Sequence, residues 1–331
     1  MENYIPPFNI TNNMIQYVAS IMEKVGKIDN FTNLNKRPML RRNNRINSIH
    51  SSLAIEANSL TLNQVKDVIN GKLVIGPQKE IQEVKNAYNA YEMIKEINPY
   101  SVIDLKKVHS VMTFLTVEES GDFRKGNEGV FDGDKCIFMA PKPEFVNNLI
   151  NELFEWMKNS KEKVHPLILS SIFHYEFLFI HPFSDGNGRM ARLWQNTLLS
   201  KWKEIFEYIP IETQIKKYQD KYYKVINNCN KNGNSNEFIE FMLQIIDETL
   251  DAVLESVNKD ILHISIYVNK LLDAMDYNTP MSSNEIMEKL GIKSKENLRA
   301  NYLDPAIENG LIKMTLPDKP TSKNQMYYKV Q

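Results

Sequence analysis

Apolar residues recur at intervals of three and four along most of this chain. In the stretch NMIQYVASIMEKVGKI they form one stripe, composed of Met14, Tyr17, Val18, Ile21, Met22 and Val25. This period is close to the 3.6 residues of a helical turn, so it predicts an amphipathic helix. The same spacing predicts a helix that ends near residue 57 and further helices at 101–118, 143–158, 166–179, 187–203, 212–230 and 235–257. The fold class is therefore expected to be mainly α.

One segment before the C-terminal region departs from the helical period. In GNEGVFDGDKCIFMAPKP, an Asp-Gly pair lies between Val-Phe and Cys-Ile-Phe-Met. An Asp-Gly pair between apolar runs is typical of a tight β-hairpin. We therefore expect one short hairpin in the otherwise helical part of the chain.

The pattern changes again near residue 260. ILHISIYVNKLLDAM, SSNEIMEKLGI and SKENLRANYLDPAIENGLI each have the spacing of a helix, and the last two end at a glycine. The final segment, LIKMTLPDKPTSKNQMYYKV, alternates like two strands around a Pro-Asp turn. Three helices followed by a β-wing predict a winged helix.

Composition narrows the class of protein. Of the 331 residues, 42% are apolar and 24% charged, which is ordinary for a globular protein. Forty basic residues oppose forty-one acidic ones, so no global attraction to nucleic acid or to an acidic membrane is expected. Cys136 and Cys229 form neither a metal-ligand spacing nor a disulfide framework, and no signal peptide is apparent, which favours a cytoplasmic protein. The most apolar stretch, LILSSIFHYEFLFI, contains a histidine and a glutamate and predicts a buried helix, so no membrane span is expected.

The stretch HPFSDGNGRMAR carries the candidate chemistry. Gly186 and Gly188 flank Asn187 where a helix is expected to begin. A helix N-terminus presents unpaired N–H groups, and glycines let a phosphate approach the backbone. No Gly-Lys-Ser/Thr follows, so this is not a Walker A loop. The pattern indicates an anion cradle, although the Asp-Gly-Asn-Gly turn alone could be purely structural.

Charged residues surround this cradle. Arg189 and Arg192 are three residues apart and share a helix face, where two guanidinium groups would suit a polyphosphate. A single carboxylate, Asp185, is then best explained as a Mg²⁺ ligand. His181, whose reference pKa is near ~6.5, is the obvious general base. Together these residues predict phosphoryl or nucleotidyl transfer to a hydroxyl group; the alternatives are a packed histidine and a solvated pair of arginines.

This stretch resembles the signature of the Fic family, HxFx(D/E)GNGRxxR, with every specified position matched. The segments SGDFRKGNEGVFDG, IFMAPKPEFV, LFEWM and HPLILSSIFHYEFLFIHPF are also similar to Fic domains. The resemblance implies a Fic-type helical bundle with a short β-hairpin flap and a C-terminal winged-helix domain. It divides the chain into an N-terminal helical region at 1–99, a Fic domain at 100–258 and a winged helix at 259–331.

Members of the family mostly transfer AMP from ATP to a hydroxyl of a target protein. The resemblance implies that His181 is the base for a Ser, Thr or Tyr hydroxyl and that Asp185 coordinates Mg²⁺. The ATP-binding set that it implies comprises Gly186, Asn187, Gly188, Arg189, Arg192, Tyr222 and Tyr223. For the two tyrosines, packing in the core is the alternative interpretation.

Two further segments resemble regulatory and docking parts of the family. The predicted hairpin matches the flap, with Val130, Ile137, Phe138 and Met139 as residues that would hold an extended target segment by strand addition. A simple surface hairpin is the alternative.

The stretch SSLAIEANSL resembles the inhibitory motif (S/T)xxxE(G/N), with an inhibitory helix around residues 48–57. Ser52 and Glu56 fill its defined positions, and a carboxylate beside Arg192 would take the place of the γ-phosphate. The chain departs from the motif at Ala57, where the family has Gly or Asn, which leaves the strength of inhibition open. Because alanine is a good helix former, we expect the helix to persist through Ala57.

Three functions stay open at this point. The first is a protein adenylyltransferase inhibited by Glu56, with another protein or itself as target. The second is a related enzyme that removes AMP or uses another nucleotide. The third is a DNA-binding regulator acting through the winged helix. Residues 261–331 contain nine Lys/Arg and eight Asp/Glu, a balance of only +1, which disfavours nucleic acid and favours protein docking or a homodimer.

Overall fold

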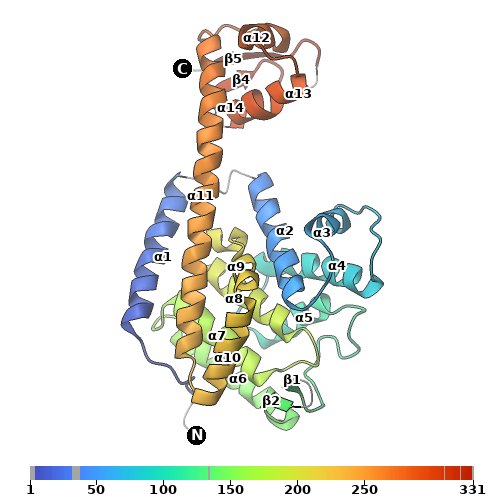
Figure 1. Ribbon diagram of the computed structural model, residues 1–331, viewed down its shortest axis with the longest axis vertical. Helices are drawn as coiled ribbons and strands as arrows, with labels where there is room; N and C mark the ends of the chain where they lie inside the picture. Colours follow the sequence, from blue (N-terminus) through green and yellow to red (C-terminus); the bar gives the residue numbers. More distant parts are fainter. Residues whose placement is uncertain (1–3, 32–37, 133–134, 309, 321, 330–331) are drawn as a thin grey trace. The chain divides into compact units, whose positions relative to one another are not determined.

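The structure is a computed structural model that describes residues 4–31, 38–132, 135–308, 310–320 and 322–329. In this part of the chain the protein is mainly α-helical, with two small antiparallel sheets, which confirms the predicted fold class. The chain divides into two compact units, Met1–Ala252 and Val253–Gln331 (Figure 1), and each is described by itself.

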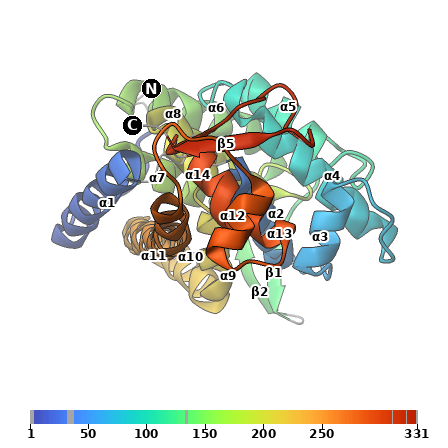
Figure 2. The same ribbon diagram turned by 90° about the horizontal axis from the view of Figure 1, so that it is seen from above.

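The first unit is a helical bundle. Its helices are α1 (Asn12–Phe31), α2 (Pro38–Ile55), α3 (Leu62–Ile69), α4 (Gln78–Glu92), α5 (Val102–Met112), α6 (Pro143–Ser160), α7 (Pro166–Ile180), α8 (Asn187–Trp202), α9 (Ile211–Lys217), α10 (Gln219–Asn232) and the first part of α11 (Asn236–Ala274). Short 3₁₀ turns, η2 (Met93–Lys95) and η3 (Glu204–Tyr208), follow α4 and α8. Both ribbon views place α1 and the α3–α4 pair on opposite sides of this unit (Figures 1 and 2).

Helices α7 and α8 form the core of the bundle. Twelve of the fifteen residues of α7 are buried, and from Asn187 to Leu199 almost every residue of α8 is buried as well. A helix that is apolar around its whole circumference must be enclosed by other helices, as LILSSIFHYEFLFI predicts. The loop between α7 and α8 is therefore anchored at both ends by the most buried elements of the unit.

The predicted hairpin is formed by β1 (Gly129–Asp132) and β2 (Lys135–Met139), which pair antiparallel. Gly129 faces Met139 and Val130 faces Phe138, and the register shifts after Val130. The turn at residues 133–134 lies outside the described residues.

Two helix boundaries differ from the sequence prediction. The helix predicted at 212–230 is interrupted at Tyr218, whose ψ of 31° is far from the helical value of about −42°. Conversely, the helices predicted at 235–257 and after residue 260 form one helix, α11, of 39 residues. No glycine or proline interrupts the stretch from Asn236 to Ala274, so no local signal ends it. The division between the two compact units, at residues 252 and 253, falls within this helix.

The second unit adds α12 (Ser283–Leu290), α13 (Lys295–Leu298), a π-helical turn η4 (Arg299–Leu303) and α14 (Asp304–Glu308) to the end of α11. Its sheet has the strand order β3 (Met281–Ser282), β5 (Met326–Lys329), β4 (Ile312–Met314). Pro305 lies two residues after the π-helical turn, and a proline within a regular α-helix clashes with the carbonyl four residues before it. The sequence predicts the helices and the last two strands of this unit but not β3, which pairs with β5.

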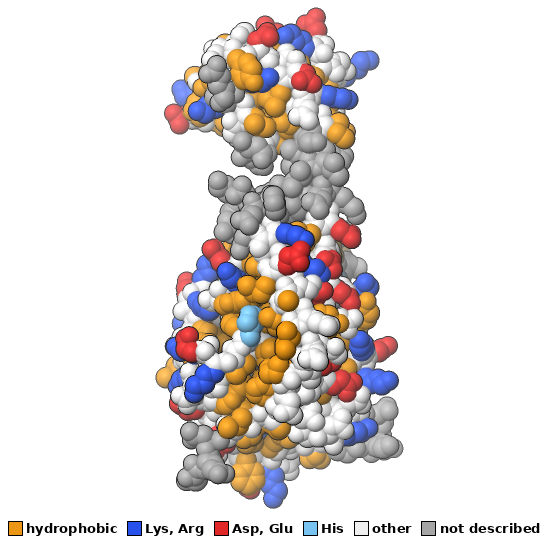
Figure 3. All heavy atoms as spheres, turned by 90° about the vertical axis from the view of Figure 1, so that its left-hand side faces the viewer, with side chains coloured by type: hydrophobic (Ala, Val, Ile, Leu, Met, Phe, Trp, Pro, Cys, Tyr) orange, Lys and Arg blue, Asp and Glu red, His pale blue; other side chains and the backbone are white. Residues whose placement is uncertain are grey.

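Figure 3 shows one face on which hydrophobic side chains gather in a broad strip bordered by charged ones. Several large apolar side chains near the N-terminus are exposed, among them Ile5, Ile10, Ile15 and Met22. Met22 was expected on the buried stripe of its helix, but that stripe is formed by Met14, Ile21, Val25 and Ile28. Among the described residues, no helix combines the length and the apolar character needed to cross a membrane.

Candidate active site

The candidate base, His181, ends helix α7. Its φ of 51° lies in the left-handed region, and its N–H donates to Phe177 O at 2.9 Å, which closes the helix. Arg124 holds this conformation, because its Nε donates to His181 O at 2.6 Å and its backbone N–H donates to Pro182 O at 2.9 Å. Arg124 is buried and also donates to the carbonyls of Gly126 and Pro141. It therefore ties the loop to the base of the hairpin.

The ring of His181 is oriented by a hydrogen bond to the last turn of α7. Nδ1 lies 3.3 Å from Leu178 O, a carbonyl that can only accept, so Nδ1 carries the proton and Nε2 keeps its lone pair. Burial lowers the pKa of His181 below its ordinary value, and the nearby Arg124 guanidinium lowers it further. The imidazole is thus neutral at pH 7, which is the form a general base requires.

The loop between the two helices is fixed from inside. Phe183 is fully buried, and the Asn187 side chain bonds both sides of its backbone: Nδ2 donates to Phe183 O at 2.7 Å and Oδ1 accepts from Phe183 N at 3.0 Å. The amide of Asn187, which the resemblance assigned to ATP, is therefore used to shape the loop. Its backbone N–H still belongs to the exposed first turn of α8.

A second histidine, which the sequence analysis did not select, supports the loop from below. The ring of His109 on α5 stacks on Phe183 at 3.6 Å between centroids and 4° between planes. Nδ1 accepts from Gly121 N at 2.9 Å, so Nε2 carries the proton and donates to Asp185 O at 3.0 Å. Burial lowers the pKa of His109 to about 4. This neutral histidine holds the backbone of the candidate metal ligand.

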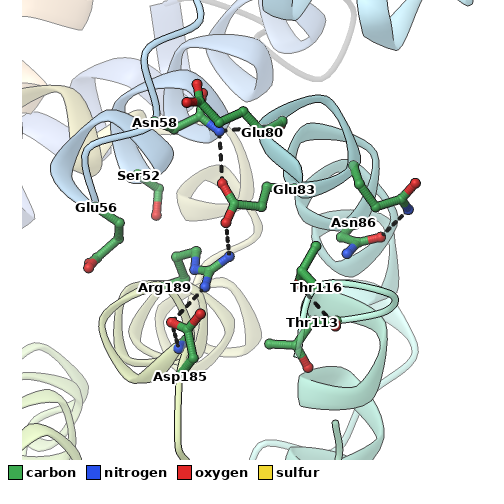
Figure 4. Close-up of polar contacts among 12 residues, drawn as sticks. Ser52, Glu56, Asn58, Glu80, Glu83, Asn86, Thr113, Thr116, Asp185 and Arg189 are labelled. Carbon is green, nitrogen blue, oxygen red and sulfur yellow. Dashed lines mark hydrogen bonds and ion pairs between the residues drawn. The ribbon is translucent and has the colours of Figure 1, made fainter. Parts of the chain in front are cut away.

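Arg189 lies between two carboxylates (Figure 4). Its Nη2 lies 2.9 Å from Asp185 Oδ1, and its Nη1 lies 3.7 Å from Glu83 Oε1 on α4. Glu83 also accepts a hydrogen bond of 2.9 Å from Asn58 Nδ2, which continues the network to the segment after α2. Arg189 is buried, and its Nε and Nη1 have no hydrogen-bond acceptor among the described residues. Buried donors without an acceptor are unfavourable, and Nη1 has only the longer ion-pair contact to Glu83, so both nitrogens could bind an anion.

Arg192 contacts both residues of the inhibitory motif. Its Nε donates to Ser52 Oγ at 3.0 Å, and its Nη2 donates to Ser52 O at 2.9 Å and to Glu56 Oε1 at 2.7 Å. Burial opposes the charge of Arg192, but the facing Glu56 carboxylate outweighs this effect and raises the pKa of the guanidinium. Within the described part of the chain, Nη1 of Arg192 has no acceptor.

The carboxylate of Glu56 also covers the glycine cradle. A Cβ atom placed on Gly188 would clash with Glu56 Oε1 and would lie 3.1 Å from Arg192 Nη1. Gly186 has a φ of 82°, a conformation that L side chains rarely adopt. The backbone turn thus favours glycine at position 186, and at Gly188 the absent side chain leaves the space that the Glu56 carboxylate occupies.

Helix α2 ends earlier than predicted. The conformation of its end explains why the motif (S/T)xxxE(G/N) has Gly or Asn after the glutamate. Ala57 does not continue the helix but has a φ of 64°. Asn58 N donates to Leu53 O at 3.1 Å and Ala57 N donates to Ala54 O at 3.3 Å, which is the Schellman pattern of a helix C-terminus. The expectation based on helix propensity was wrong, because position 57 is the left-handed residue after the helix, where Gly and Asn are favoured. Ala57 adopts this left-handed conformation as well, but as an L-residue with a side chain it does so under backbone strain.

The tyrosine pair separates in the structure. Tyr222 is buried, and its hydroxyl lies 2.8 Å from Nε2 of His174. Tyr223 is 45% exposed, and its hydroxyl donates to Ile55 O at 3.3 Å. Tyr222 is therefore placed in the core behind the site, whereas Tyr223 stands at its edge beside the end of α2.

The hairpin residues are described only in part. The side chain of Met139 is 55% exposed, and the ring of Phe138 packs against Phe179 at 5.5 Å between centroids. The side chains of Val130 and Ile137 lie outside the described residues. β2 thus offers an accessible side chain at Met139 and an anchored one at Phe138.

Asp185 fits the role of a Mg²⁺ ligand. Its side chain is 44% exposed, and its Oδ1 accepts from Gly186 N and Arg189 while Oδ2 has no bonding partner in the described part of the chain. No group of three or more His, Cys, Asp or Glu side chains among the described residues could hold a metal ion. A hard cation here would therefore need phosphate oxygens to complete its ligands, as Mg²⁺ commonly does.

Comparisons with known proteins agree with this geometry. Residues 99–199 match the Fic/DOC family, and residues 267–329 match the family described as "Filamentation induced by cAMP protein Fic-like, C-terminal domain". The crystal structure of a Fic family protein from Desulfovibrio desulfuricans G20 is 41% identical in sequence. The match covers 99% of this chain and 98% of that chain, with a TM-score of 0.74. The fold and the motif thus define a Fic-type domain followed by a Fic-like C-terminal domain. The chain belongs to the Fic family.

Curated relatives include the protein adenylyltransferase Fic of Nematostella vectensis and that of Aedes aegypti. Each is 30% identical over 220 residues, which is 63% of this chain and 48% or 42% of the relative. This chain therefore spans about half the length of the curated relatives it matches. Fic-1 of C. elegans, residues 134–508, shares the fold with a TM-score of 0.63 at 20% identity, covering 75% of this chain and 73% of that one.

Proposed function

We propose that this protein transfers AMP from ATP to a Ser, Thr or Tyr hydroxyl of a target protein. One observation carries the proposal. A neutral His181 with a free Nε2 ends α7, next to a helix N-terminus and to three guanidinium nitrogens of Arg189 and Arg192 that have no hydrogen-bond acceptor among the described residues. This combination suits a hydroxyl that attacks a bound polyphosphate. The name of the curated relatives, protein adenylyltransferase, supports the same reaction.

The transfer step balances with the groups at hand. Nε2 of His181 takes the proton of the target hydroxyl, and its oxygen forms a bond to the α-phosphorus of ATP. The bond from the α-phosphorus to the bridging oxygen breaks, and pyrophosphate leaves. The N–H groups at the start of α8 and the guanidiniums of Arg189 and Arg192 stabilise the phosphate charge. Mg²⁺, when bound at Asp185, supplies further charge neutralisation.

Glu56 is proposed to inhibit this reaction. Its carboxylate lies 2.7 Å from Nη2 of Arg192 and fills the space above Gly188. A terminal phosphate would otherwise bind there. Two anions cannot share this position, so ATP would bind with its phosphates displaced from His181. The flap strand β2, with Met139 exposed, is proposed to hold the target segment by strand addition.

The decisive experiment is intact-mass spectrometry after incubation with ATP and Mg²⁺. Glu56→Gly should gain the mass of AMP faster than the wild type, by about ten- to a hundredfold, because a charge-assisted hydrogen bond of ~1.5–3 kcal/mol is removed. Glu56→Gly combined with His181→Ala should lose ~10²- to 10⁴-fold in rate, the usual contribution of a general base. Equal labelling with and without His181 would refute the assignment of the base.

If the wild type shows no self-labelling, an added target is required. A protein already modified with AMP then separates transfer from removal: release of AMP that depends on Glu56 would favour the de-AMPylating alternative. Incubation with other nucleoside triphosphates tests the choice of nucleotide.

Binding of the second unit to DNA remains a prediction with little support from charge, and a gel shift at two salt concentrations tests it.

A further inference from the structure

A pocket of about 460 Å³ lies at the other end of helix α2, outside the candidate active site. It is lined by Arg41, Arg42, Arg45, Tyr88, Glu92, Lys95, Glu207 and Tyr208. Helices α2 and α4 and the turns η2 and η3 each contribute to it. A volume of this size is within the usual range for pockets that bind small molecules.

The lining of this pocket carries more positive than negative charge. Four cationic side chains face two carboxylates. Glu207 is already engaged, with its Oε1 at 2.7 Å from Arg45 and its Oε2 at 3.5 Å from Lys95. Within the described residues, neither Arg41 nor Arg42 has a carboxylate within ion-pair distance. The pocket therefore retains a net positive charge after its internal ion pairs are formed.

The cationic groups are held in place. Arg45 is buried, and its Nη1 donates to Tyr91 O at 2.7 Å while Nη2 pairs with Glu207. The guanidinium of Arg41 stacks on the ring of Tyr208 with its carbon 5.0 Å from the centroid. Nε of Arg41 is buried and has no acceptor among the described residues. A fixed, partly desolvated guanidinium with an unused donor is a strong site for an anion.

We infer that this arginine pocket binds a phosphate-bearing small molecule, and that the bound phosphate holds helix α2 in the position that keeps Glu56 on Arg192. A tetrahedral phosphate offers oxygens in several directions, which suits guanidiniums that converge from different turns of one helix. The pocket differs from the active site in its elements, because it contains no residue of the motif-bearing loop or of α8.

Helix α2 connects the two sites. Arg41, Arg45, Ser48, Ser52 and Glu56 follow one another at spacings of four, three, four and four, so they lie along one face of the helix up to its end. At 1.5 Å per residue, the first and last of them are ~22 Å apart. Tyr91 adds a second connection, because its carbonyl accepts from Arg45 and its hydroxyl donates at 2.6 Å to Glu212, which lines a small cavity together with Arg192. A ligand on Arg41 and Arg45 would therefore restrain the helix that carries Glu56; this consequence for Glu56 rests on the proposed function.

Site-resolved arginine modification tests the binding. The protein is treated with phenylglyoxal in the presence of inorganic phosphate or pyrophosphate, with potassium chloride at matched ionic strength as the reference, and modified peptides are quantified by mass spectrometry. Arg41 and Arg42 should react about tenfold more slowly at ten times the Kd. Arg299, a 60% exposed arginine of the second unit, serves as the control and should not be protected. Absent protection, or protection equal to that of Arg299, would overturn the proposal.

Matched variants extend this test. Arg41→Gln should weaken the binding of phosphate at this pocket at least ~tenfold in calorimetry, as expected for the loss of a charge-assisted contact, whereas Arg299→Gln should leave it unchanged. Circular dichroism confirms that both variants fold. Unchanged phosphate affinity in Arg41→Gln would show that the arginine pocket is not the site.

Hydrogen exchange tests the effect on α2 independently of catalysis. Phosphate should slow exchange in peptides covering residues 48–57 of the wild type and should not do so in Arg41→Gln. In the transfer assay, phosphate should reduce labelling of the wild type but not that of Glu56→Gly. An equal reduction in both would indicate competition at the active site and contradict the control of Glu56. If no variant transfers AMP, the proposed function fails, while arginine protection and hydrogen exchange still decide the pocket.

Discussion

Two helices end at the candidate active site on a residue with a left-handed backbone, and neither residue is glycine. Helix α7 ends at His181 with a φ of 51°, and helix α2 ends before Ala57 with a φ of 64°. This conformation costs an L-residue roughly 1–2 kcal/mol. The same strain therefore occurs at the base that is proposed to drive the reaction and beside the carboxylate that is proposed to prevent it.

The two ends differ in what holds them. At His181, the buried Arg124 binds the carbonyls of the histidine and of the following proline, and the flanking helices are buried. At Ala57, two backbone hydrogen bonds close the turn, and side chains from other helices bind the last carbonyls of α2: Lys216 Nζ donates to Ala54 O at 2.8 Å and Gln219 Nε2 donates to Ile55 O at 3.1 Å. The comparison shows that one buried arginine supplies the side-chain bonds at the end of α7, whereas side chains of several helices share this task at the end of α2. A single substitution should therefore affect the end of α7 more than the end of α2.

The largest effect is expected at the end of α7, where one arginine makes the side-chain bonds. Arg124→Met removes three charge-assisted bonds to carbonyls and should lower the free energy of unfolding by about 4 kcal/mol. Urea denaturation measures this change, with Arg299→Met as the exposed control, for which a change under ~0.5 kcal/mol is expected. A small effect at Arg124 would mean that His181 keeps its conformation without this clamp.

Acid should destabilise the loop that follows His181, because His109 supports this loop only in its neutral form. The pKa of His109 is lowered to about 4, below its unfolded value of about 6.5, so the unfolded state binds the proton first. Its contribution to stability is complete above pH 6.5 and is lost as the pH falls toward 4, by about 3 kcal/mol in total. Burial shifts the pKa of His181 in the same direction. Denaturation at pH 7 and pH 5 for wild type and His109→Gln measures the slope, which should be shallower in the variant; identical slopes would contradict the role of His109.

The smallest effect is expected at the end of α2, where only the backbone strain of Ala57 is changed. Ala57→Gly should raise the free energy of unfolding by about 1 kcal/mol, because glycine adopts a positive φ without strain. Ala54→Gly, one turn earlier on the same helix, is the matched control and should lower it by about 1 kcal/mol. If both variants were destabilised equally, the left-handed ending of α2 would be wrong. If Ala57→Gly is stabilised, AMP transfer should slow as well, since Glu56 would be held more firmly.

The sequence was sufficient to predict the placement of residues that depend only on their neighbours within the motif. His181, Asp185 and the two glycines could be placed because their spacing within one loop determines their geometry. The fold class followed from helical periodicity, and the hairpin from its Asp-Gly turn.

The sequence was insufficient where a partner is distant in the chain. Glu83 and His109 lie 106 and 76 positions before their partners Arg189 and Asp185, and nothing local marks them. Arg124 stands in a segment that resembles the family, but its bonds to the loop after α7 depend on tertiary packing. Ala57 was misjudged for another reason: helix propensity describes residues inside a helix, and this one lies just beyond its end.

The missing side chain of Gly188 has a consequence for how this protein could change. One hydrogen atom in place of a methyl group leaves a space that the Glu56 carboxylate now enters. An alanine at this position would push the Glu56 carboxylate aside and would fill the same space with a methyl group. If a terminal phosphate binds there, as proposed, one substitution would remove the inhibitory contact and obstruct the substrate together.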